Sequence, residues 1–187
     1  MHTKKLAESQ IFEIENFITD AECDSILKWF ISEKKESTNE GNILFNNRTI
    51  PYSTITSSKI KNIVNSFRFD STAIARELYQ KVLYPDYTDL VYWPTGLSMD
   101  VHADAVWLDG TPAKFPYRYC AGVCYLNDDY EGGETYFPNF DIQTKPQKGK
   151  VILFPSDLEH RHGVREIIGD RYTMPIWFSK EKINLEN

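Results

Sequence analysis

The sequence predicts a mainly β fold with flanking α-helices. Two observations point to this fold class, and a third indicates a single domain. Aromatic residues make up 14% of the chain, with 11 Tyr and 11 Phe, which favours β-strands around a lined pocket. Helical periodicity is confined to residues 1–85, whereas short β-branched and aromatic runs fill residues 86–180. With 187 residues and 41% hydrophobic content, the chain suits a single domain, 1–187, in which 1–85 gives helical support to a β core at 86–180.

The amino-terminal part is predicted to begin with a strand and to continue with three helices. Residues 11–17 alternate between apolar and polar side chains, as in a strand. Thr19 and Glu22 then form the capping-box pattern that starts a helix. Apolar positions at helical spacing mark a first helix at Cys23, Ile26, Leu27, Phe30 and Ile31, a second at Ile60, Ile63, Val64 and Phe67, and a third, beginning at Asp70, at Ile74, Leu78 and Val82.

Seven strands are predicted in the β core, each bounded by turn residues. They cover residues 90–93, 97–104, 119–126, 134–137, 151–154, 160–168 and 172–178. The turns fall at 94–96, 127–129, 132–133, 147–149 and 169–170. Several short strands with regular turns are typical of a double-sheet roll or barrel, and the helices are expected to cover one of its sheets.

His102 and Asp104 carry the clearest chemical signal in the chain. Two residues apart on a strand, their side chains point to the same face, and His162 on a distant strand can complete a three-point metal site. Two imidazoles and one carboxylate, with the opposite positions open, are the ligand set of non-haem Fe(II) oxygenases. Arg171 lies further along and could pair bidentately with a carboxylate, as a cosubstrate such as 2-oxoglutarate would require.

Further motifs surround these residues. They are Tyr-Trp-Pro-Thr-Gly at 92–96, Tyr-Leu-Asn at 125–127, Glu-Gly-Gly-Glu-Thr at 131–135, Phe-Pro-Ser at 154–156 and Gly-Asp-Arg-Tyr at 169–172. In this combination the chain resembles the prolyl-4-hydroxylase-like branch of the Fe(II)/2-oxoglutarate dioxygenases over about 86–180. The resemblance implies a double-stranded β-helix, which is a jelly-roll or cupin-like fold, supported by amino-terminal helices.

The same resemblance implies roles for individual residues. His102, Asp104 and a distal histidine would hold the iron, and Arg171 would bind the distal carboxylate of 2-oxoglutarate. Tyr125 would be a second donor to that carboxylate, with a plain core tyrosine as the alternative, and Tyr92 would line the cosubstrate pocket. A buried dianion needs such a fixed cation and hydrogen-bond donors to offset its desolvation.

The distal histidine is either His160 or His162. The two lie two residues apart, so both would face the same side of a strand. His162 fits the family pattern up to Arg171 with one residue missing, whereas His160 leaves one residue too many. We favour His162 and expect the other histidine behind the ligands or at the rim of the pocket.

The resemblance also implies a reaction. Relatives that halogenate replace the carboxylate ligand by a small residue, so the presence of Asp104 favours hydroxylation of an unactivated C–H bond. Fe(II), 2-oxoglutarate and O2 are expected to take part, with ascorbate as a reductant. The leading substrate is a prolyl residue in a peptide or protein. The alternatives are a hydroxylase of a free amino acid or other small molecule, a non-catalytic β-roll binding protein and a zinc hydrolase.

Composition limits the partners. A net charge of −6 argues against binding to a nucleic acid, and the nucleic-acid demethylating relatives carry a second arginine where this chain has Trp177. No apolar run is long enough to span a membrane. Three scattered cysteines without a disulfide pattern favour a reducing, cytoplasmic location, and Cys120 and Cys124, which share an apolar run, are expected to be buried thiols. Candidate substrate contacts are Arg48, Trp107, Tyr117 and Arg118, and the loop at 108–116 is either a lid or an ordinary hairpin loop. The oligomeric state is left open.

Overall fold

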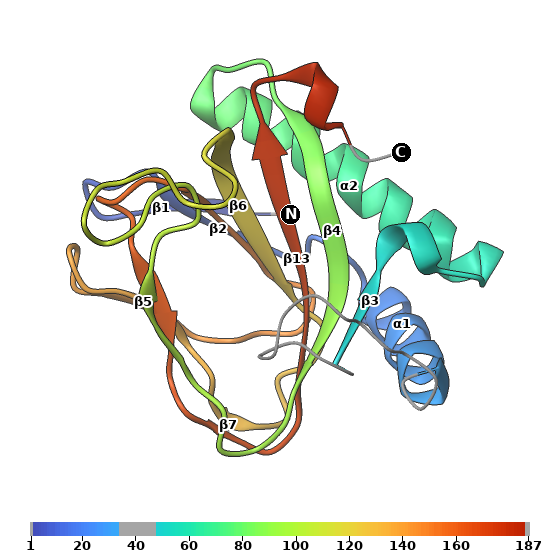
Figure 1. Cartoon of the computed structure of the whole chain (residues 1–187). Helices are drawn as coiled ribbons and strands as arrows, with labels where there is room; N and C mark the ends of the chain where they lie inside the picture. Colours follow the sequence, from blue (N-terminus) through green and yellow to red (C-terminus); the bar gives the residue numbers. More distant parts are fainter. Residues whose placement is uncertain (1, 34–47, 186–187) are drawn as a thin grey trace.

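A seven-stranded antiparallel sheet lies at the centre of the molecule, and the other elements pack against its two faces (Figure 1). The structure is a computed structural model and describes residues 2–33 and 48–185. The order of the strands is β1 (His2–Leu6), β2 (Ile11–Glu15), β10 (Val151–Pro155), β6 (Arg118–Tyr125), β13 (Arg171–Ser179), β4 (Tyr84–Trp93) and β3 (Thr49–Pro51). The helices α1 (Asp20–Glu33) and α2 (Ser58–Tyr79) lie against one face of this sheet.

Two smaller antiparallel sheets lie on the other face and close the roll (Figure 1). The first has the strand order β5 (Met99–His102), β11 (His162–Val164), β8 (Thr135–Phe137) and β9 (Ile142–Thr144). The second pairs β12 (Ile167–Ile168) with β7 (Glu131–Gly132). Short 3-10 helices, η2 (Tyr52–Thr54) and η3 (Lys182–Asn184), complete the described elements. The arrangement is the double-stranded β-helix that the sequence predicts, with helices on one sheet.

The first helix begins as its sequence predicts. The Thr19 side chain accepts a hydrogen bond from the Glu22 amide at 3.3 Å, and the Glu22 carboxylate accepts one from the Thr19 amide at 2.9 Å. This reciprocal pair is the capping box, which satisfies amides that the first turn leaves without partners. Cys23, Ile26 and Phe30 are buried along one face of α1 and Leu27 is partly buried there, whereas Ile31 is 52% exposed, so the predicted helical face is confirmed except at Ile31.

The second and third predicted helices form one helix of 22 residues, α2. The prediction of a new start at Asp70 is therefore wrong. The polar residues near it do not interrupt the helix, because the hydroxyls of Ser71 and Thr72 donate to carbonyl oxygens within the helix, those of Phe67 and Arg68, at 2.6 Å each. Such back-bonding lets a serine or threonine remain inside a helix at little cost.

The segment predicted as helical support also supplies strands. β2 confirms the strand predicted at 11–17, and it pairs with β10 inside the main sheet. β1 and β3, which the sequence does not predict, form the two edges of the main sheet. In the β core, the predicted strand at 160–168 is divided into β11 and β12, and β7 and β9 are additional short strands. Strands of two or three residues carry too little periodicity to be predicted.

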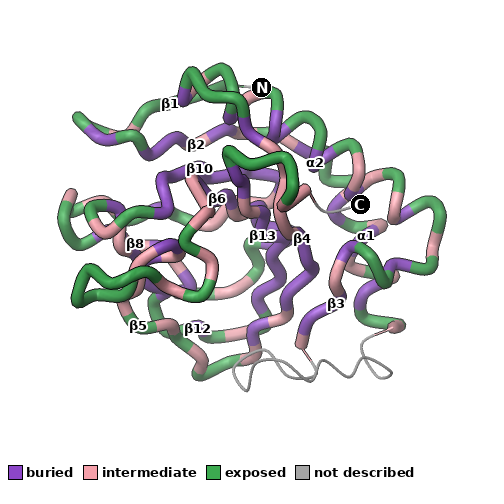
Figure 2. The backbone as a smooth tube through the Cα atoms, turned by 45° about the horizontal axis from the view of Figure 1, so that its top comes forward, coloured by how far each residue is buried: buried purple, intermediate pink, exposed green. Residues whose placement is uncertain are grey.

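Buried residues run along the strands of the main sheet (Figure 2), and the hydrophobic ones among them form clusters on both of its faces. On β13, Met174, Ile176 and Phe178 belong to the cluster that packs against α1 and α2. Arg171 and Thr173 alternate with them and face the interior of the roll, where Trp93 of β4 contacts both. The alternation therefore separates a structural face from a face that lines the interior.

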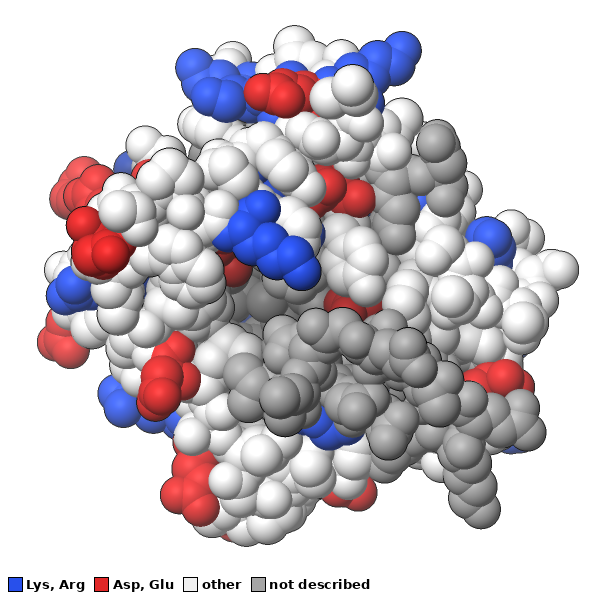
Figure 3. Space-filling view, in the orientation of Figure 1, with Lys and Arg blue, Asp and Glu red and all other residues white. Residues whose placement is uncertain are grey.

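The described surface carries charges of both signs. On the face drawn in Figure 3, Lys and Arg residues are interspersed with Asp and Glu residues. Cys120 and Cys124 are buried free thiols, as predicted, and Cys23 is one as well. Within residues 2–33 and 48–185, neither helix is long and apolar enough to cross a membrane.

Candidate metal and cosubstrate site

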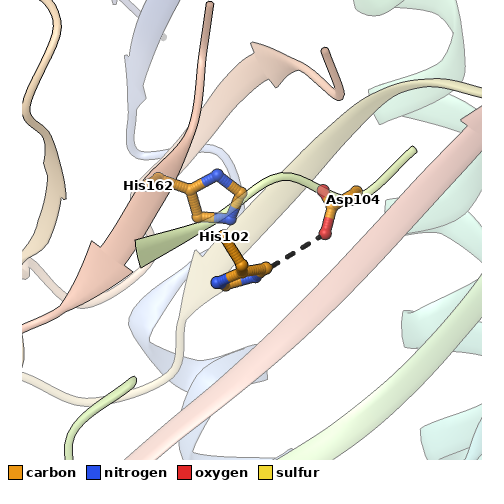
Figure 4. Close-up of side chains that lie close together, drawn as sticks. All are labelled: His102, Asp104 and His162. Carbon is orange, nitrogen blue, oxygen red and sulfur yellow. Dashed lines mark ion pairs between the residues drawn. The ribbon is translucent and has the colours of Figure 1, made fainter. Parts of the chain in front are cut away.

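Two neighbouring strands bring the predicted metal ligands together. His162, the first residue of β11, pairs directly with His102, the last residue of β5, and their ring centroids are 4.5 Å apart. Asp104 lies just beyond the end of β5, and its Oδ1 is 3.8 Å from Nε2 of His102 (Figure 4). One potential ligand atom from each of the three residues lies within 4.8 Å of the others.

Asp104 reaches this position by a different route from the one predicted. The strand ends at His102, so Asp104 is placed by the irregular segment that follows and not by alternation along a strand. The amide of the next residue, Ala105, donates to the Ser156 carbonyl at 3.0 Å. This bond fixes the backbone beside Asp104 against the end of β10.

Backbone carbonyls hold both imidazole rings. Nδ1 of His102 lies 3.0 Å from the Asp100 carbonyl oxygen, and Nδ1 of His162 lies 3.2 Å from the His160 carbonyl oxygen. A carbonyl oxygen can only accept, so each Nδ1 carries a hydrogen, and Nε2 is the nitrogen left to bind a metal. Such contacts orient a histidine whose other nitrogen binds a metal.

His162 is also held in its neutral form. Burial lowers the pKa of His162 to about 4, and the carboxylate of Asp104 opposes part of this shift. The rings of Phe154 and Phe137 surround His162, with centroids 4.4 Å and 5.7 Å away. At neutral pH the imidazole is therefore uncharged, which is the form that can bind a metal ion.

His160 lies outside this cluster. It sits in the turn before β11, where its Nδ1 lies 2.7 Å from Oδ1 of Asp157 and its ring packs against Phe140. The prediction that both histidines face the same side of one strand is wrong, because the strand begins only at His162. The geometry selects His162 as the third member of the cluster.

Arg171 is enclosed by the roll. It is the first residue of β13, and its side chain is only 1% exposed. Its Cζ lies 5.1 Å from the centroid of the Trp93 ring and 5.5 Å from that of Tyr125. Among the described residues, Nε and Nη1 of Arg171 have no hydrogen-bond partner. A buried cation without a counter-charge is costly, so this position fits an anionic ligand.

The two predicted tyrosines lie in different places. Tyr125 is fully buried inside the roll, and its hydroxyl is 3.0 Å from the hydroxyls of both Thr135 and Thr144. Tyr92 lies on the other face of β4, where it stacks on Tyr172 and donates a hydrogen bond to Asp170 at 2.7 Å. This position does not fit the cosubstrate pocket predicted for Tyr92.

Sequence reasoning missed several residues that line this part of the interior. Trp93 contacts Arg171 in place of Tyr92, and its Nε1 donates to the Thr173 hydroxyl at 3.2 Å. The hydroxyls of Thr135 and Thr144 face Tyr125. The Tyr-Trp pair at 92–93 offers a signal, because on a strand only one of two adjacent residues can face the interior.

The candidate substrate contacts gather around the loop that follows Asp104. Arg118 pairs with Asp86 at 2.6 Å, and its guanidinium lies over the ring of Trp177 at 4.5 Å. Trp107 is 57% exposed on the loop itself, which an isolated bridge between Val106 and Pro112 narrows into a hairpin. The hairpin therefore presents an exposed aromatic ring three residues after Asp104.

Two further candidates have defined contacts. Nη1 of Arg48 donates to the Tyr92 carbonyl at 3.2 Å, and its guanidinium lies 5.5 Å from the centroid of the Trp93 ring. The ring of Tyr117 meets that of Phe115 edge-on, with centroids 6.1 Å apart.

The residues present fit Fe(II) and 2-oxoglutarate. Oδ2 of Asp104 is buried and has no hydrogen-bond partner in the described part of the chain, as a metal ligand would. Two imidazoles complete a set that suits Fe(II), with the remaining coordination positions open. Arg171 supplies the cation that a buried dicarboxylate requires.

A double-stranded β-helix that carries two imidazoles, a carboxylate and a buried arginine defines the class of 2-oxoglutarate-dependent non-haem iron oxygenases. Residues 87–179 match the family model of the 2OG-Fe(II) oxygenase superfamily. The chain belongs to this superfamily and is prolyl hydroxylase-like, which confirms the resemblance seen in its motifs.

Among curated proteins, the chain is similar to prolyl 3-hydroxylase 2 of Rattus norvegicus. The two are 34% identical over 103 residues, which cover 48% of this chain and 15% of the relative. The match therefore covers less than a sixth of the length of that curated relative.

Solved structures share the fold. A viral collagen prolyl hydroxylase from Paramecium Bursaria Chlorella virus-1, in a 2OG complex, matches 94% of this chain and 98% of its own, with a TM-score of 0.69 and 18% identity. A prolyl hydroxylase from Trichoplax adhaerens, in complex with a hypoxia inducible factor oxygen degradation domain peptide fragment, matches 95% of this chain and 86% of its own, with a TM-score of 0.73 and 20% identity.

Proposed function

We propose that this chain hydroxylates a prolyl residue in a peptide or protein, with Fe(II), 2-oxoglutarate and O2. The observation that carries the proposal is the presence, inside one roll, of a three-residue metal cluster and a buried Arg171 whose Nε and Nη1 have no hydrogen-bond partner among the described residues. The similarity to prolyl hydroxylases in sequence and in fold supports prolyl residues as the substrate class.

His102, Asp104 and His162 would hold the iron on one side and leave the positions opposite them open. When bound, iron and 2-oxoglutarate supply the oxidising chemistry that inserts one oxygen atom into a C–H bond. The carboxylate of Asp104 offsets the charge of the metal, and the carbonyl contacts of the two histidines keep their Nε2 atoms directed at it.

Arg171 would bind and orient the cosubstrate by its distal carboxylate. Because Trp93 and Tyr125 enclose the guanidinium, water is kept from the ion pair, which strengthens it. The exposed hairpin that carries Trp107 lies next to Asp104 and would contact the substrate chain. A small-molecule hydroxylase would use the same metal and cosubstrate site, and only the substrate distinguishes the two.

Three further expectations belong to this proposal. We propose that residues 1–187 act as one domain, since strands from both ends of the chain share the main sheet. The buried free thiols support a reducing compartment such as the cytoplasm. Ascorbate would serve as the reductant that keeps the iron in its Fe(II) form. Each is tested separately, by limited proteolysis, by localisation of the tagged protein and by activity with and without ascorbate.

The site is tested by anaerobic titration of the metal-free protein with Fe(II) and then 2-oxoglutarate. We expect a visible metal-to-ligand charge-transfer band in the wild type and in His160→Ala, and none in His162→Ala. Arg171→Ala is expected to need much more 2-oxoglutarate to reach the same band. His160→Ala is the matched control, because His160 lies two residues away but outside the cluster.

The substrate is tested next, by mass spectrometry of prolyl peptides and of free proline after incubation in air. Hydroxylated peptide with unchanged proline supports the proposal, and the reverse result supports the small-molecule alternative. A wild-type protein that binds iron without forming the band would overturn the cosubstrate assignment. Zinc-dependent hydrolysis would then be the better hypothesis.

A further inference from the structure

A pocket of about 570 Å³ lies between α1 and the turns that follow β6 and precede β13. Leu27 and Ile31 of α1 form an apolar wall, and Ile31 is 52% exposed. Tyr172 lines the pocket from the main sheet and belongs to the hydrophobic cluster that packs against the helices. The pocket is therefore on the helix side of the sheet, whereas His162 packs against Phe154 on the interior side.

Most of the remaining lining is acidic. Four carboxylates line the pocket, those of Asp24, Asp128, Asp129 and Asp170, and Lys148 is the one cation among its described residues. Nζ of Lys148 pairs with Asp24 at 2.5 Å. The other carboxylates exceed the positive charge available, so the pocket is electronegative at neutral pH.

The carboxylates that do not pair with Lys148 are held in place by the chain itself. Each accepts one hydrogen bond: Asp128 from the amide of Lys148 at 3.1 Å, Asp129 from Asn127 at 2.7 Å and Asp170 from the hydroxyl of Tyr92 at 2.7 Å. Each of these bonds occupies one carboxylate oxygen. The second oxygen of each group is left to accept from a ligand.

Tyr172 gives an independent indication of a ligand. It is only 8% exposed, and its ring stacks on Tyr92 at 5.1 Å and meets Phe30 edge-on at 5.7 Å, measured between centroids. Its hydroxyl has no hydrogen-bond partner in the described part of the chain. Burial raises the pKa of Tyr172, and the charges of Asp170 and Asp129 raise it further. A buried ring therefore holds a free hydroxyl beside two carboxylates at the pocket wall.

An extended organic cation fits this lining better than a metal ion does. Among the described residues, only His102, Asp104 and His162 bring three ligand atoms within 4.8 Å of one another, so the carboxylates of the pocket are too far apart to share one ion. Arginine and lysine side chains combine an apolar stem with a cationic end. The stem matches the wall formed by Leu27 and Ile31, and the cationic end matches the carboxylates.

We propose that this pocket docks a basic segment of a partner polypeptide and takes one arginine or lysine side chain between α1 and Tyr172. The donors of that side chain meet the free oxygens of Asp129 and Asp170 and the hydroxyl of Tyr172. The exposed Ile31 at the rim offers apolar contact to the residues next to the cation, which favours a polypeptide over a free amine. This docking site does not depend on the proposed reaction.

The test is an NMR titration of the full chain, which detects weak binding and locates it. The probe is an acetylated and amidated Gly-Leu-Arg-Leu-Gly peptide, and the matched peptide has citrulline, which keeps the shape of arginine without its charge. We expect the arginine peptide to shift the amide signals of Leu27, Ile31 and Tyr172. It should bind at least about 10-fold more tightly than the citrulline peptide, because hydrogen bonds to a charged group are the stronger ones.

Two variants test the pocket residues. Tyr172→Phe keeps the buried ring and removes a hydroxyl that has no partner among the described residues, so its fold should be retained. We expect it to weaken the arginine peptide by about 3-fold to 10-fold. Asp129→Asn should weaken it by at least about 3-fold. Glu77→Gln removes the same charge from an exposed position of α2 outside the pocket and should change the affinity by less than about 2-fold.

Equal binding of the arginine and citrulline peptides would overturn the proposal, as would the absence of shifts at Leu27 and Ile31. An effect of Glu77→Gln as large as that of Tyr172→Phe would mean that only the net charge of the protein attracts the peptide. Spermidine is the competitor that represents a free amine. If it shifts the same amides and binds as tightly as the arginine peptide, the pocket takes a small cation and not a polypeptide segment.

Discussion

His102 and His162 face each other across β5 and β11 as a directly paired set of residues. Their positions as metal ligands therefore depend on the register of two short strands. A shift of one residue in this register would turn one of the two rings away from the other. The register of this strand pair shifts between His162 and Val164, because Val164 pairs with Met99. The direct pairing of the two histidines therefore lies beside an irregularity in the ladder.

Asp104→Asn is expected to separate metal binding from stability. The loss of the negative charge should lower the affinity for Fe(II) or Mn(II) by about 10-fold to 100-fold or more. The metal-free protein should be at least as stable as the wild type, because asparagine fills the same space without burying a net charge. Metal titration and urea unfolding of the metal-free protein measure the two effects. A large loss of stability would mean that Asp104 is a structural residue.

Three glycine substitutions should have graded effects. Gly96→Ala meets nothing within 4 Å, so only the strain of its positive φ of +82° is expected, about 1 kcal/mol. Gly133→Ala adds a Cβ 2.9 Å from both Arg171 and Tyr130, and should also weaken 2-oxoglutarate binding. In Gly132→Ala the Cβ would lie 1.9 Å from the Glu166 carbonyl oxygen, so this variant should be the least stable.

Urea unfolding and calorimetric binding of 2-oxoglutarate rank the three glycine variants. Equal binding of 2-oxoglutarate in Gly96→Ala and Gly133→Ala would show that Arg171 and Tyr130 can move aside.

Asn127 should stabilise the start of β13, and with it Arg171. Its Nδ2 donates to Oδ1 of Asp129 and to the Asp170 carbonyl, both at 2.7 Å, and its Oδ1 accepts from the Tyr172 amide at 2.8 Å. Asn127→Ala leaves the buried Tyr172 amide without its partner and removes two part-buried hydrogen bonds, so we expect a loss of about 2–4 kcal/mol in the free energy of unfolding.

Asn139→Ala is the control for this effect, since that exposed side chain makes one hydrogen bond to the Glu159 carbonyl. Its loss in denaturant unfolding should be less than about 1 kcal/mol. Equal losses in the two variants would contradict the role given to Asn127.

The thiols should be unreactive in the folded protein and should make it sensitive to alkali. Burial raises the pKa of Cys23 to about 12 and raises the pKa values of Cys120 and Cys124 as well. A folded chain that keeps protons which the unfolded chain releases is fully stabilised below about pH 9 and loses stability as the pH rises toward 12.

A disulfide reagent at pH 8 is expected to titrate few thiols in the native protein and all three in denaturant. Urea unfolding at pH 8 and pH 10.5 should show the loss of stability. Rapid reaction of a native thiol at pH 8 would contradict the burial of these residues.

The composition and motifs of the sequence predict much of this fold and most of the site. His102, Asp104, His162 and Arg171 are marked by residue type and spacing, and the structure gathers the first three of them within 4.8 Å. The β core and the capping box of α1 follow from local patterns that the structure retains. Such local patterns predict the structure correctly where the local preference of the residues and the global fold favour the same conformation.

Two features of the site could not be predicted from the sequence: the residue at which a strand begins, and the face of the sheet toward which a side chain points. His160 and His162 are equivalent by spacing until the first residue of β11 is known. Tyr92 and Trp93 are both aromatic, and only the orientation of β4 decides which of them meets Arg171. The close approach of Tyr130 to Arg171 depends on a glycine at position 133, where φ is +66° and a Cβ would lie 2.9 Å from both side chains.

The enclosed guanidinium of Arg171 is expected to make the stability of this protein depend on the supply of the anion that it binds. The fold holds a positive charge away from water before any anion arrives, and that charge lowers the unfolding free energy of the empty protein. A dianion that binds only the folded chain restores it, by about 2.7 kcal/mol at a hundred times its Kd. Copies made when 2-oxoglutarate is scarce would therefore unfold more often and be degraded sooner.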